Sequence, residues 1–261
     1  MLNMHLVKSW LRYAATAKGR HGLHSPFMYR LADKVIYDKT PYPEYGLVED
    51  QRRKLLRDQR LLTLTDLGAG SQYGNRKQRR VSALASNALK SPRLAQLIYR
   101  LVRDTRPGTI LELGTCLGIT TLYLAKAQAD ARVITIEGCP QTAAVAREVF
   151  RSAKAGQIES LTGNFDEVLP DLLKTLPSLE VLFVDGNHRR DATLNYFEWC
   201  LPILHEDSLI IFDDIHWSKG MEEAWERIKA HPAVSVTADL FHIGLVFLRG
   251  GQAKEHFTLR F

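Results

Sequence analysis

The sequence has few cysteines and no long apolar run. Its 261 residues contain only 3 cysteines, which are too few and too widely spaced for a disulfide framework or a paired metal knuckle. This low count favours a reducing compartment, so we expect a cytoplasmic location. Basic residues interrupt the N-terminal stretch before the core of a signal peptide can form. No later stretch approaches membrane-spanning length, so we expect no membrane span.

The composition is that of a globular protein, but its charge is unevenly distributed. With 45% hydrophobic and 25% charged residues, the chain is neither disordered, collagenous nor a coiled coil. Residues 1–106 carry 21 basic and 8 acidic side chains, whereas residues 107–261 carry 14 and 21. The basic part could meet nucleic acid, an anionic lipid headgroup or an acidic or phosphorylated small molecule, or it could pack on the acidic part.

Apolar β-branched runs alternate with amphipathic stretches from residue 107 onward, which is typical of a parallel sheet in an α/β protein. The predicted strands are Thr109–Leu113, Arg132–Ile136, Ile158–Thr162, Glu180–Val184, Ser208–Phe212, Val234–Ala238 and Gly244–Leu248. The last two are so close in sequence that we expect an antiparallel pair. Residues 1–106 show helical periodicity, with helices expected at His5–Ala17, Pro26–Tyr37, Glu44–Leu62, Arg79–Ala88 and Pro92–Asp104. Arg106-Pro107-Gly108 marks the expected boundary between a helical extension, residues 1–106, and an α/β domain, residues 107–261.

A glycine corner follows the first predicted strand. Gly114 and Gly118 stand where this strand turns into a helix, so the backbone can approach a ligand and the helix offers unpaired amide donors. Cys116 replaces the middle glycine of a dinucleotide-binding loop, and the Lys-Ser/Thr pair of a phosphate-binding loop is missing. Glu137 follows the second strand and suits the two hydroxyls of a ribose. These features favour a nucleoside without a diphosphate.

Four segments together resemble a known family. LELGTCLGITTLYLA, VITIEG, SLTGNF and VDGNH are similar to class I S-adenosylmethionine-dependent methyltransferases, particularly the divalent-metal-dependent O-methyltransferases. The resemblance covers residues 107 to about 249. It implies a Rossmann-like sheet of seven strands, the last of them antiparallel, with S-adenosylmethionine as cofactor. The alternative is that the two glycines only shape a turn in another α/β protein.

The resemblance also assigns cofactor-binding residues by position. It implies contact with the methionine part of the cofactor for Glu112, Gly114, Thr115, Gly118 and Thr120. Glu137 would hold the ribose, and Gly163, Asn164 and Phe165 form the segment that would face the adenine.

Carboxylates and a histidine follow the fourth and fifth predicted strands. Asp185 comes after the fourth strand, and Asp213 and Asp214 come at the end of the fifth. Carboxylates converging at the carboxyl ends of neighbouring parallel strands repel one another unless a cation lies between them, and hard oxygen ligands select magnesium, calcium or manganese. The resembling enzymes bind a metal at these positions, which implies that all three aspartates are metal ligands and that magnesium is the expected ion. Asp214 departs from the asparagine often found in catechol-type enzymes, and capping of the next helix is the alternative role for the aspartates.

A base must accept the proton of a hydroxyl substrate. His188 stands three residues after Asp185, and a free imidazole with a pKa of about 6.5 accepts protons at neutral pH. We therefore predict that His188 and Asp185 are catalytic, with His216 as a second candidate for a base or a metal neighbour. The alternative for each histidine is a structural hydrogen bond. The Asn-Pro-Pro-Tyr run of adenine-N6 methyltransferases is missing after the fourth strand, which favours an oxygen acceptor.

Two segments of the basic part are ambiguous. DLGAGS at residues 66–71 mimics the glycine corner, but a charged stretch follows it, so we interpret it as a loop over the active-site mouth. Its basic residues would hold an anionic substrate or form a solvated segment, and they are Arg76, Lys77, Arg79 and Arg80. In HGLHSPF, Ser25 followed by Pro26 predicts a helix N-cap.

These observations predict an S-adenosylmethionine-dependent methyltransferase that methylates a small or lipid-linked hydroxyl acceptor with the aid of a divalent metal. An anionic acceptor is compatible with the basic part, and homodimer formation is left open. An RNA methyltransferase that grips RNA with residues 1–106 is the alternative, but no aromatic stacking stripe or RNA-module motif supports it. A non-catalytic scaffold with a retained methyltransferase fold is the third interpretation.

Overall fold

The computed structural model describes residues 4–65 and 78–261. Its packing divides the chain into two compact units, of which the first comprises Met1–Asp38 and Ser178–Phe261 and the second comprises Lys39–Pro177. The expected division into a substrate cap, residues 1–106, and a catalytic domain is a statement about function and stays a prediction.

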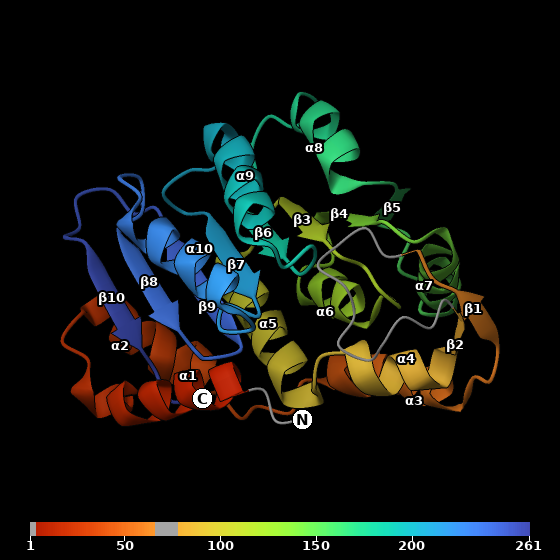
Figure 1. Cartoon of the computed structure of the whole chain (residues 1–261), viewed down its shortest axis with the longest axis horizontal. Helices are drawn as coiled ribbons and strands as arrows, with labels where there is room; N and C mark the ends of the chain where they lie inside the picture. The colour runs from red at the N-terminus through yellow and green to blue at the C-terminus, as the bar shows by residue number, and fades with distance from the viewer. Residues whose placement is uncertain (1–3, 66–77) are drawn as a thin grey trace. The chain divides into compact units, whose positions relative to one another are not determined.

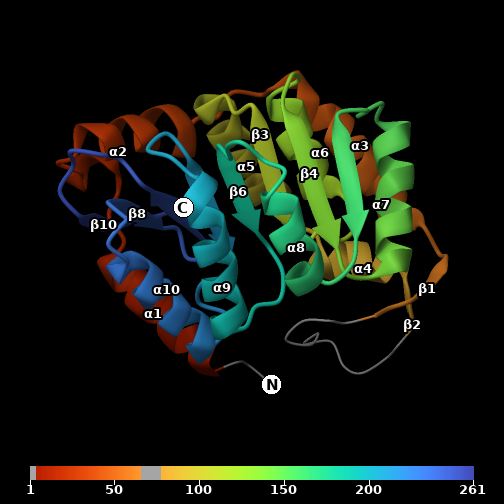
Figure 2. The same cartoon turned by 90° about the horizontal axis from the view of Figure 1, so that it is seen from above.

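The second unit is built on three parallel strands, shown in Figure 2. They are β3 (Thr109–Leu113), β4 (Arg132–Glu137) and β5 (Ile158–Thr162). Leu111 lies opposite Ile134, which in turn lies opposite Glu159. All three strands were predicted from their apolar runs. A separate antiparallel pair, β1 (Leu61–Thr63) and β2 (Gln78–Arg80), was not predicted.

Six helices accompany these strands within the described part of the second unit. They are α3 (Pro43–Arg57), α4 (Val81–Ala88), α5 (Pro92–Thr105), α6 (Ile119–Ala127), α7 (Pro140–Ser152) and α8 (Phe165–Leu173). Nearly every side chain of α6 is buried because α3 and α5 both pack against it. The helix expected at Glu44–Leu62 was predicted too long. It ends at Arg57, because Asp58 adopts an extended backbone and its carboxylate accepts the backbone N–H of Arg60.

The described part of the first unit contains five paired strands. They are β6 (Val181–Val184), β7 (Leu209–Asp213), β8 (Val236–Asp239), β9 (Ile243–Phe247) and β10 (Glu255–Thr258). β6 and β7 are parallel, and β9 runs antiparallel to both β7 and β8. The predicted antiparallel last strand of the methyltransferase sheet is therefore confirmed. β10, which pairs in parallel with β8, is an additional strand that was not predicted.

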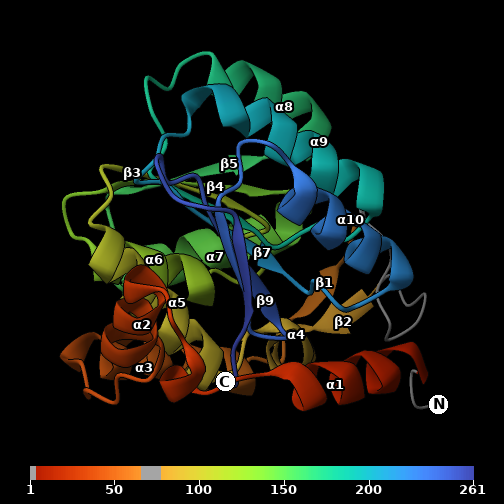
Figure 3. The same ribbon diagram turned by 90° about the vertical axis from the view of Figure 1, so that its left-hand side faces the viewer.

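The helices of the first unit are visible in Figures 1 and 3, where α9 and α10 lie side by side. They are α1 (Met4–Thr16), α2 (Pro26–Leu31), α9 (Arg190–Cys200) and α10 (Lys219–Ala230), with shorter turns at Arg20–Gly22, Ala32–Ile36 and Leu201–Ile203. The predicted N-cap is confirmed, because the Ser25 side chain accepts the backbone N–H of Met28. Among the described residues, no helix has the length and apolar character needed to cross a bilayer.

Candidate functional site

The corner between β3 and α6 requires glycine at two positions. Gly114 has a φ of 109° and Gly118 a φ of 81°, conformations that other residues rarely adopt. At Gly118 a Cβ atom would also lie 2.5 Å from the ring of Phe150. The backbone N–H of Gly114 donates to the carbonyl of Ile136 at 2.9 Å, which ties the corner to β4. The sequence therefore builds a tight strand-to-helix corner, as predicted.

Glu137 is held beside this corner at the end of β4. One carboxylate oxygen accepts the backbone N–H of Cys116 at 2.7 Å, and the other accepts that of Cys139 at 2.9 Å. Burial raises the pKa of Glu137, while these two backbone donors act in the opposite direction. The acid predicted to hold a ribose is thus fixed against the glycine corner.

Glu112 lies beneath the corner and is fully buried. Its Oε2 atom accepts hydrogen bonds from the hydroxyls of Thr121 at 2.5 Å and Thr135 at 2.6 Å. Its Oε1 atom has no hydrogen-bond partner in the described part of the chain. Burial raises the pKa of Glu112 to about 7. The Thr115 hydroxyl also bonds to Thr135, at 2.5 Å, so this group of side chains braces the corner from within.

The loop after β5 adjoins the end of β4, where Glu137 is the last residue. The backbone N–H of Gly163 donates to the carbonyl of Glu137 at 3.0 Å. The Asn164 side chain caps α8 by accepting the N–H of Asp166 at 3.2 Å, and Phe165 is buried. All nine predicted cofactor residues therefore lie in the second unit, eight of them at or after the carboxyl ends of β3, β4 and β5 and Glu112 within β3. Their roles toward the cofactor stay a prediction.

A second cluster lies at the ends of β6 and β7 in the first unit. Ligand atoms of Asp185, His188 and Asp213 all lie within 4.8 Å of one another. The Nε2 atom of His188 also lies 3.9 Å from Oδ2 of Asp214. Asp213 is the last residue of β7 and only 2% exposed, whereas the other three side chains are partly exposed. Carboxylate oxygens with one imidazole nitrogen form a donor set that fits a hard or borderline divalent cation.

Left-handed backbone at two residues shapes these loops. Asp214 has a φ of 53°, and its N–H donates to the carbonyl of His242 at 2.7 Å. Asn187 has a φ of 52°, and its Nδ2 atom donates to the hydroxyl of Tyr196 on α9 at 2.8 Å. Sequence reasoning missed the role of Asn187 and Tyr196. An asparagine in the loop was the available signal, because asparagine tolerates this backbone conformation better than most residues.

His216, the second candidate base, is held by carboxylates. Its Nδ1 atom lies 3.0 Å from Oε1 of Glu222, and its Nε2 atom lies 2.8 Å from Oδ2 of Asp239. Burial works to lower the pKa of His216, but the two carboxylates outweigh it and the pKa is raised. The ring also stacks on Phe241, with centroids 5.3 Å apart. Both ring nitrogens are thus engaged with carboxylates outside the Asp185 cluster.

Part of the positive charge of residues 1–106 is neutralised locally. Arg20 pairs with Asp33 at 2.7 Å, and Arg60 pairs with Asp58 at 2.7 Å and Glu148 at 2.8 Å. Four basic residues were proposed to hold an anionic substrate. Arg79 and Arg80 belong to β2. Arg76 and Lys77, like the DLGAGS segment, lie outside the described residues.

With the glycine corner and the acidic cluster described, the chain can be compared with known proteins. Residues 111–215, less than half of the chain, match a family model described as a methyltransferase domain. A catechol O-methyltransferase of Niastella koreensis is 30% identical over 128 residues, which are 48% of this chain and 57% of that protein. A transmembrane O-methyltransferase of Propithecus coquereli is 39% identical over 84 residues, or 31% of each chain.

The fold of the chain is similar to those of solved structures. An O-methyltransferase from Bacillus cereus in complex with SAH aligns with a TM-score of 0.58 at 20% identity, covering 84% of this chain and 96% of that one. The Rossmann-like methyltransferase fold and the resemblance to O-methyltransferases, both expected from the sequence, are confirmed. The aligned region spans little more than half of the first relative's length and about a third of the second's.

Proposed function

We propose that this chain transfers the methyl group of S-adenosylmethionine to an oxygen of a small acceptor, with the aid of a divalent cation. The observation that carries the proposal is the Asp185, His188 and Asp213 cluster in a chain with a methyltransferase domain. O-methyltransferases among the relatives and structural neighbours support the reaction class. Glu137 and the glycine corner lie beside each other, which supports S-adenosylmethionine as the cofactor.

S-adenosylmethionine would bind at the carboxyl ends of β3, β4 and β5. Glu137 would accept hydrogen bonds from the ribose hydroxyls, because its carboxylate is fixed by two backbone donors and is partly exposed. Gly114 and Gly118 would leave room for the methionine part, and Asn164 and Phe165 would flank the adenine. The Oε1 atom of Glu112 is buried beneath this corner and has no partner among the described residues, so it could accept a hydrogen bond from the cofactor.

Asp185, Asp213 and Asp214 would hold the cation, which we expect to be magnesium. When bound, such a cation lowers the pKa of a coordinated hydroxyl and orients its oxygen. His188 would take the proton of the acceptor at Nε2, the atom that faces Asp185 and Asp214. The nearby carboxylates stabilise the imidazolium that this proton transfer creates. His188 also lies within the candidate ligand cluster, so it could instead be a fourth metal ligand. Experiments must distinguish this role from that of a base.

The acceptor is proposed to be a small hydroxyl compound. One relative is named a catechol O-methyltransferase, so a catechol ring is the first probe to use. An acidic or lipid-linked acceptor remains compatible with the basic residues of the N-terminal part. The cytoplasmic location expected from the cysteine count stays a prediction.

The test is methyl transfer from labelled S-adenosylmethionine to 3,4-dihydroxybenzoate, with 4-hydroxybenzoate and adenine as comparison acceptors. We expect label on the catechol oxygen in magnesium, and we expect EDTA to abolish transfer. Transfer that persists after chelation would remove the metal from the proposal. Transfer to adenine nitrogen but not to either phenol would overturn the oxygen acceptor.

A further inference from the structure

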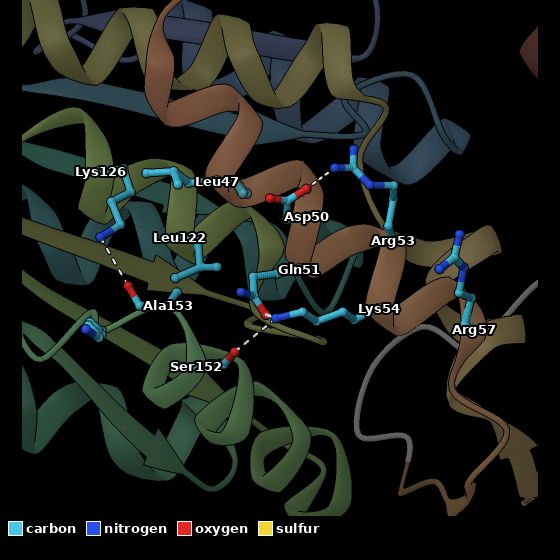
Figure 4. Close-up of a pocket in the computed structure, with 12 residues that line it drawn as sticks. Leu47, Asp50, Gln51, Arg53, Lys54, Arg57, Leu122, Lys126, Ser152 and Ala153 are labelled. Atoms are coloured by element: carbon cyan, nitrogen blue, oxygen red, sulfur yellow. Dashed lines mark hydrogen bonds and ion pairs between the residues drawn. The ribbon is translucent and has the colours of Figure 1, made fainter.

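The second unit contains a cavity of about 620 Å³ that the proposed methyl transfer does not use. One wall is formed by α3, and the other by residues of α6 and by the carboxyl-terminal end of α7 with the two residues that follow it (Figure 4). The volume is within the range of pockets that bind small ligands.

Among the described residues that line this cavity, five are basic and one is a carboxylate. The basic residues are Arg53, Lys54, Arg57, Lys126 and Lys154. The carboxylate, Asp50, is already paired with Arg53, as the dashed line in Figure 4 shows. The cavity therefore has a surplus of positive charge after its internal ion pair is counted.

The remaining cations are bound by neutral groups or lack partners. Lys54 donates to the Ser152 hydroxyl at 3.3 Å, and Lys126 donates to the backbone carbonyl of Ala153, also at 3.3 Å. Within residues 4–65 and 78–261, the guanidinium of Arg57 and the ammonium of Lys154 have neither a hydrogen bond nor an ion pair. Cations gathered around one hollow repel one another, and an anion in the hollow would relieve that repulsion.

The same cavity also has an apolar side. Leu47 on α3 is 58% exposed, whereas Val48 and Leu122, which also line the cavity, are buried behind it. A ligand with an anionic head and a short apolar chain would therefore match both parts of the surface.

The cavity is separate from the cofactor corner. Helix α6 begins directly after Gly118, and Lys126 lies eight residues farther on, which is about 12 Å along a helix. Helix α7 begins at Pro140, close to Glu137, and Ser152 is its last residue. Apart from the buried Leu122, the residues of α6 and α7 that line the cavity are thus at the helix ends opposite to the cofactor loops.

We propose that this cavity binds a small molecule that carries a phosphate group on a short apolar chain. Phosphate is favoured among anions because its doubly charged head can contact several cations at once, and arginine offers it paired donors. A small molecule is favoured over a membrane surface because the cations line a hollow rather than a flat face. This binding site is separate from the proposed methyl-transfer site, and its ligand is proposed independently of the methyl acceptor.

Calorimetric titration of the full chain with hexyl phosphate tests the proposal, with inorganic phosphate and hexanol as partial probes. We expect hexyl phosphate to bind about tenfold more tightly than inorganic phosphate, because part of its chain is buried, and we expect hexanol not to bind. The double variant R57A/K154A should weaken hexyl phosphate binding by about tenfold or more, because charged hydrogen bonds are lost. Neither side chain has a partner among the described residues, so the variant should fold normally.

Lys39→Ala is the matched control, because Lys39 is an exposed cation of the same unit outside the cavity. It should bind hexyl phosphate as the wild type does. Absence of hexyl phosphate binding at millimolar concentration, or equal affinity in the wild type and the double variant, would overturn the proposal. If the chain co-sediments with anionic phospholipid vesicles but does not bind hexyl phosphate, the basic residues bind a membrane surface. That result would also overturn the proposal. S-adenosylmethionine affinity, measured in parallel, should be the same in all variants.

Discussion

The Nε2 atom of His188 lies 4.0 Å from Oδ1 of Asp185, three residues earlier in the same loop. Oδ2 of Asp214, from the loop after β7, lies 3.9 Å from the same nitrogen. One imidazole therefore faces carboxylates from two loops, which is the arrangement expected for a base beside a metal site and also for a ligand within it.

Substitution of His188 separates these two roles. If His188 is the base, His188→Gln should lower kcat by about 10²–10⁴-fold, the usual contribution of a positioned base, and should leave magnesium affinity within a few-fold of the wild type. Steady-state kinetics and magnesium titration provide the two readouts. His205→Gln, at a half-exposed histidine of the same unit, serves as the control. A tenfold or larger loss of magnesium affinity in His188→Gln would identify a ligand rather than a base.

Asp213 should be required for metal binding. Asp213→Asn preserves the size of a side chain that is only 2% exposed but removes its charge, so we expect magnesium affinity to fall at least tenfold, measured by calorimetry. Asp207→Asn makes the same change at an exposed aspartate of the first unit and should have no effect. Equal magnesium binding in both variants would exclude Asp213 as a ligand.

Glu112 should make the stability of the chain depend on pH. Burial raises its pKa from 4.5 to about 7, so the folded state binds this proton more tightly than the unfolded state does. Its contribution to the unfolding free energy is therefore most favourable below about pH 4.5. It declines as the pH rises from 4.5 to about 7 and is lost above that.

Urea unfolding of Glu112→Gln between pH 4 and 8 checks this contribution. The decline from pH 4.5 to 7 should be smaller in the variant by about 3 kcal/mol, from 1.36 kcal/mol per pKa unit. Glu167→Gln, at an exposed position of the same unit, should retain the decline of the wild type. Parallel pH curves for the wild type and Glu112→Gln would show that Glu112 does not titrate in this range.

Gly118 should tolerate no side chain. In Gly118→Ala the new Cβ would lie 2.5 Å from the Phe150 ring at a φ of 81°, so backbone strain adds to overpacking. We expect a loss of about 2–5 kcal/mol in unfolding free energy. Gly156→Ala is the matched control, because a Cβ atom at that position would meet no other atom within 4 Å. A thermal or urea midpoint for Gly118→Ala equal to that of Gly156→Ala would contradict the packing at this corner.

The main strands and the positions of the candidate site could be predicted from the sequence. The apolar runs of β3, β4, β6 and β7 are long enough to be recognised as buried strands without tertiary information. Asp185 directly follows β6, His188 lies in the same loop, and Asp213 ends β7. Because parallel strands bring their carboxyl ends to one edge, the convergence of these three residues followed from topology.

The parts that were missed depend on contacts distant in sequence. β1 and β2 are three residues long and mostly exposed, so they carry no apolar alternation, and β10 has only four residues. The bond from Asn187 to Tyr196 and the bracing of Glu112 by Thr121 and Thr135 require the folded chain to be seen. The basic cavity likewise brings α3 together with α6 and α7, which come much later in the sequence.

Calorimetric titration with S-adenosylmethionine, for the wild type and for Glu137→Gln, tests the proposed cofactor site most directly. We predict saturable one-to-one binding to the wild type. Glu137→Gln should bind at least tenfold more weakly, because the charged partner of the ribose hydroxyls is lost, whereas Glu167→Gln should bind normally. An absence of binding to the wild type at millimolar S-adenosylmethionine, or an affinity unchanged in Glu137→Gln, would contradict the proposed site.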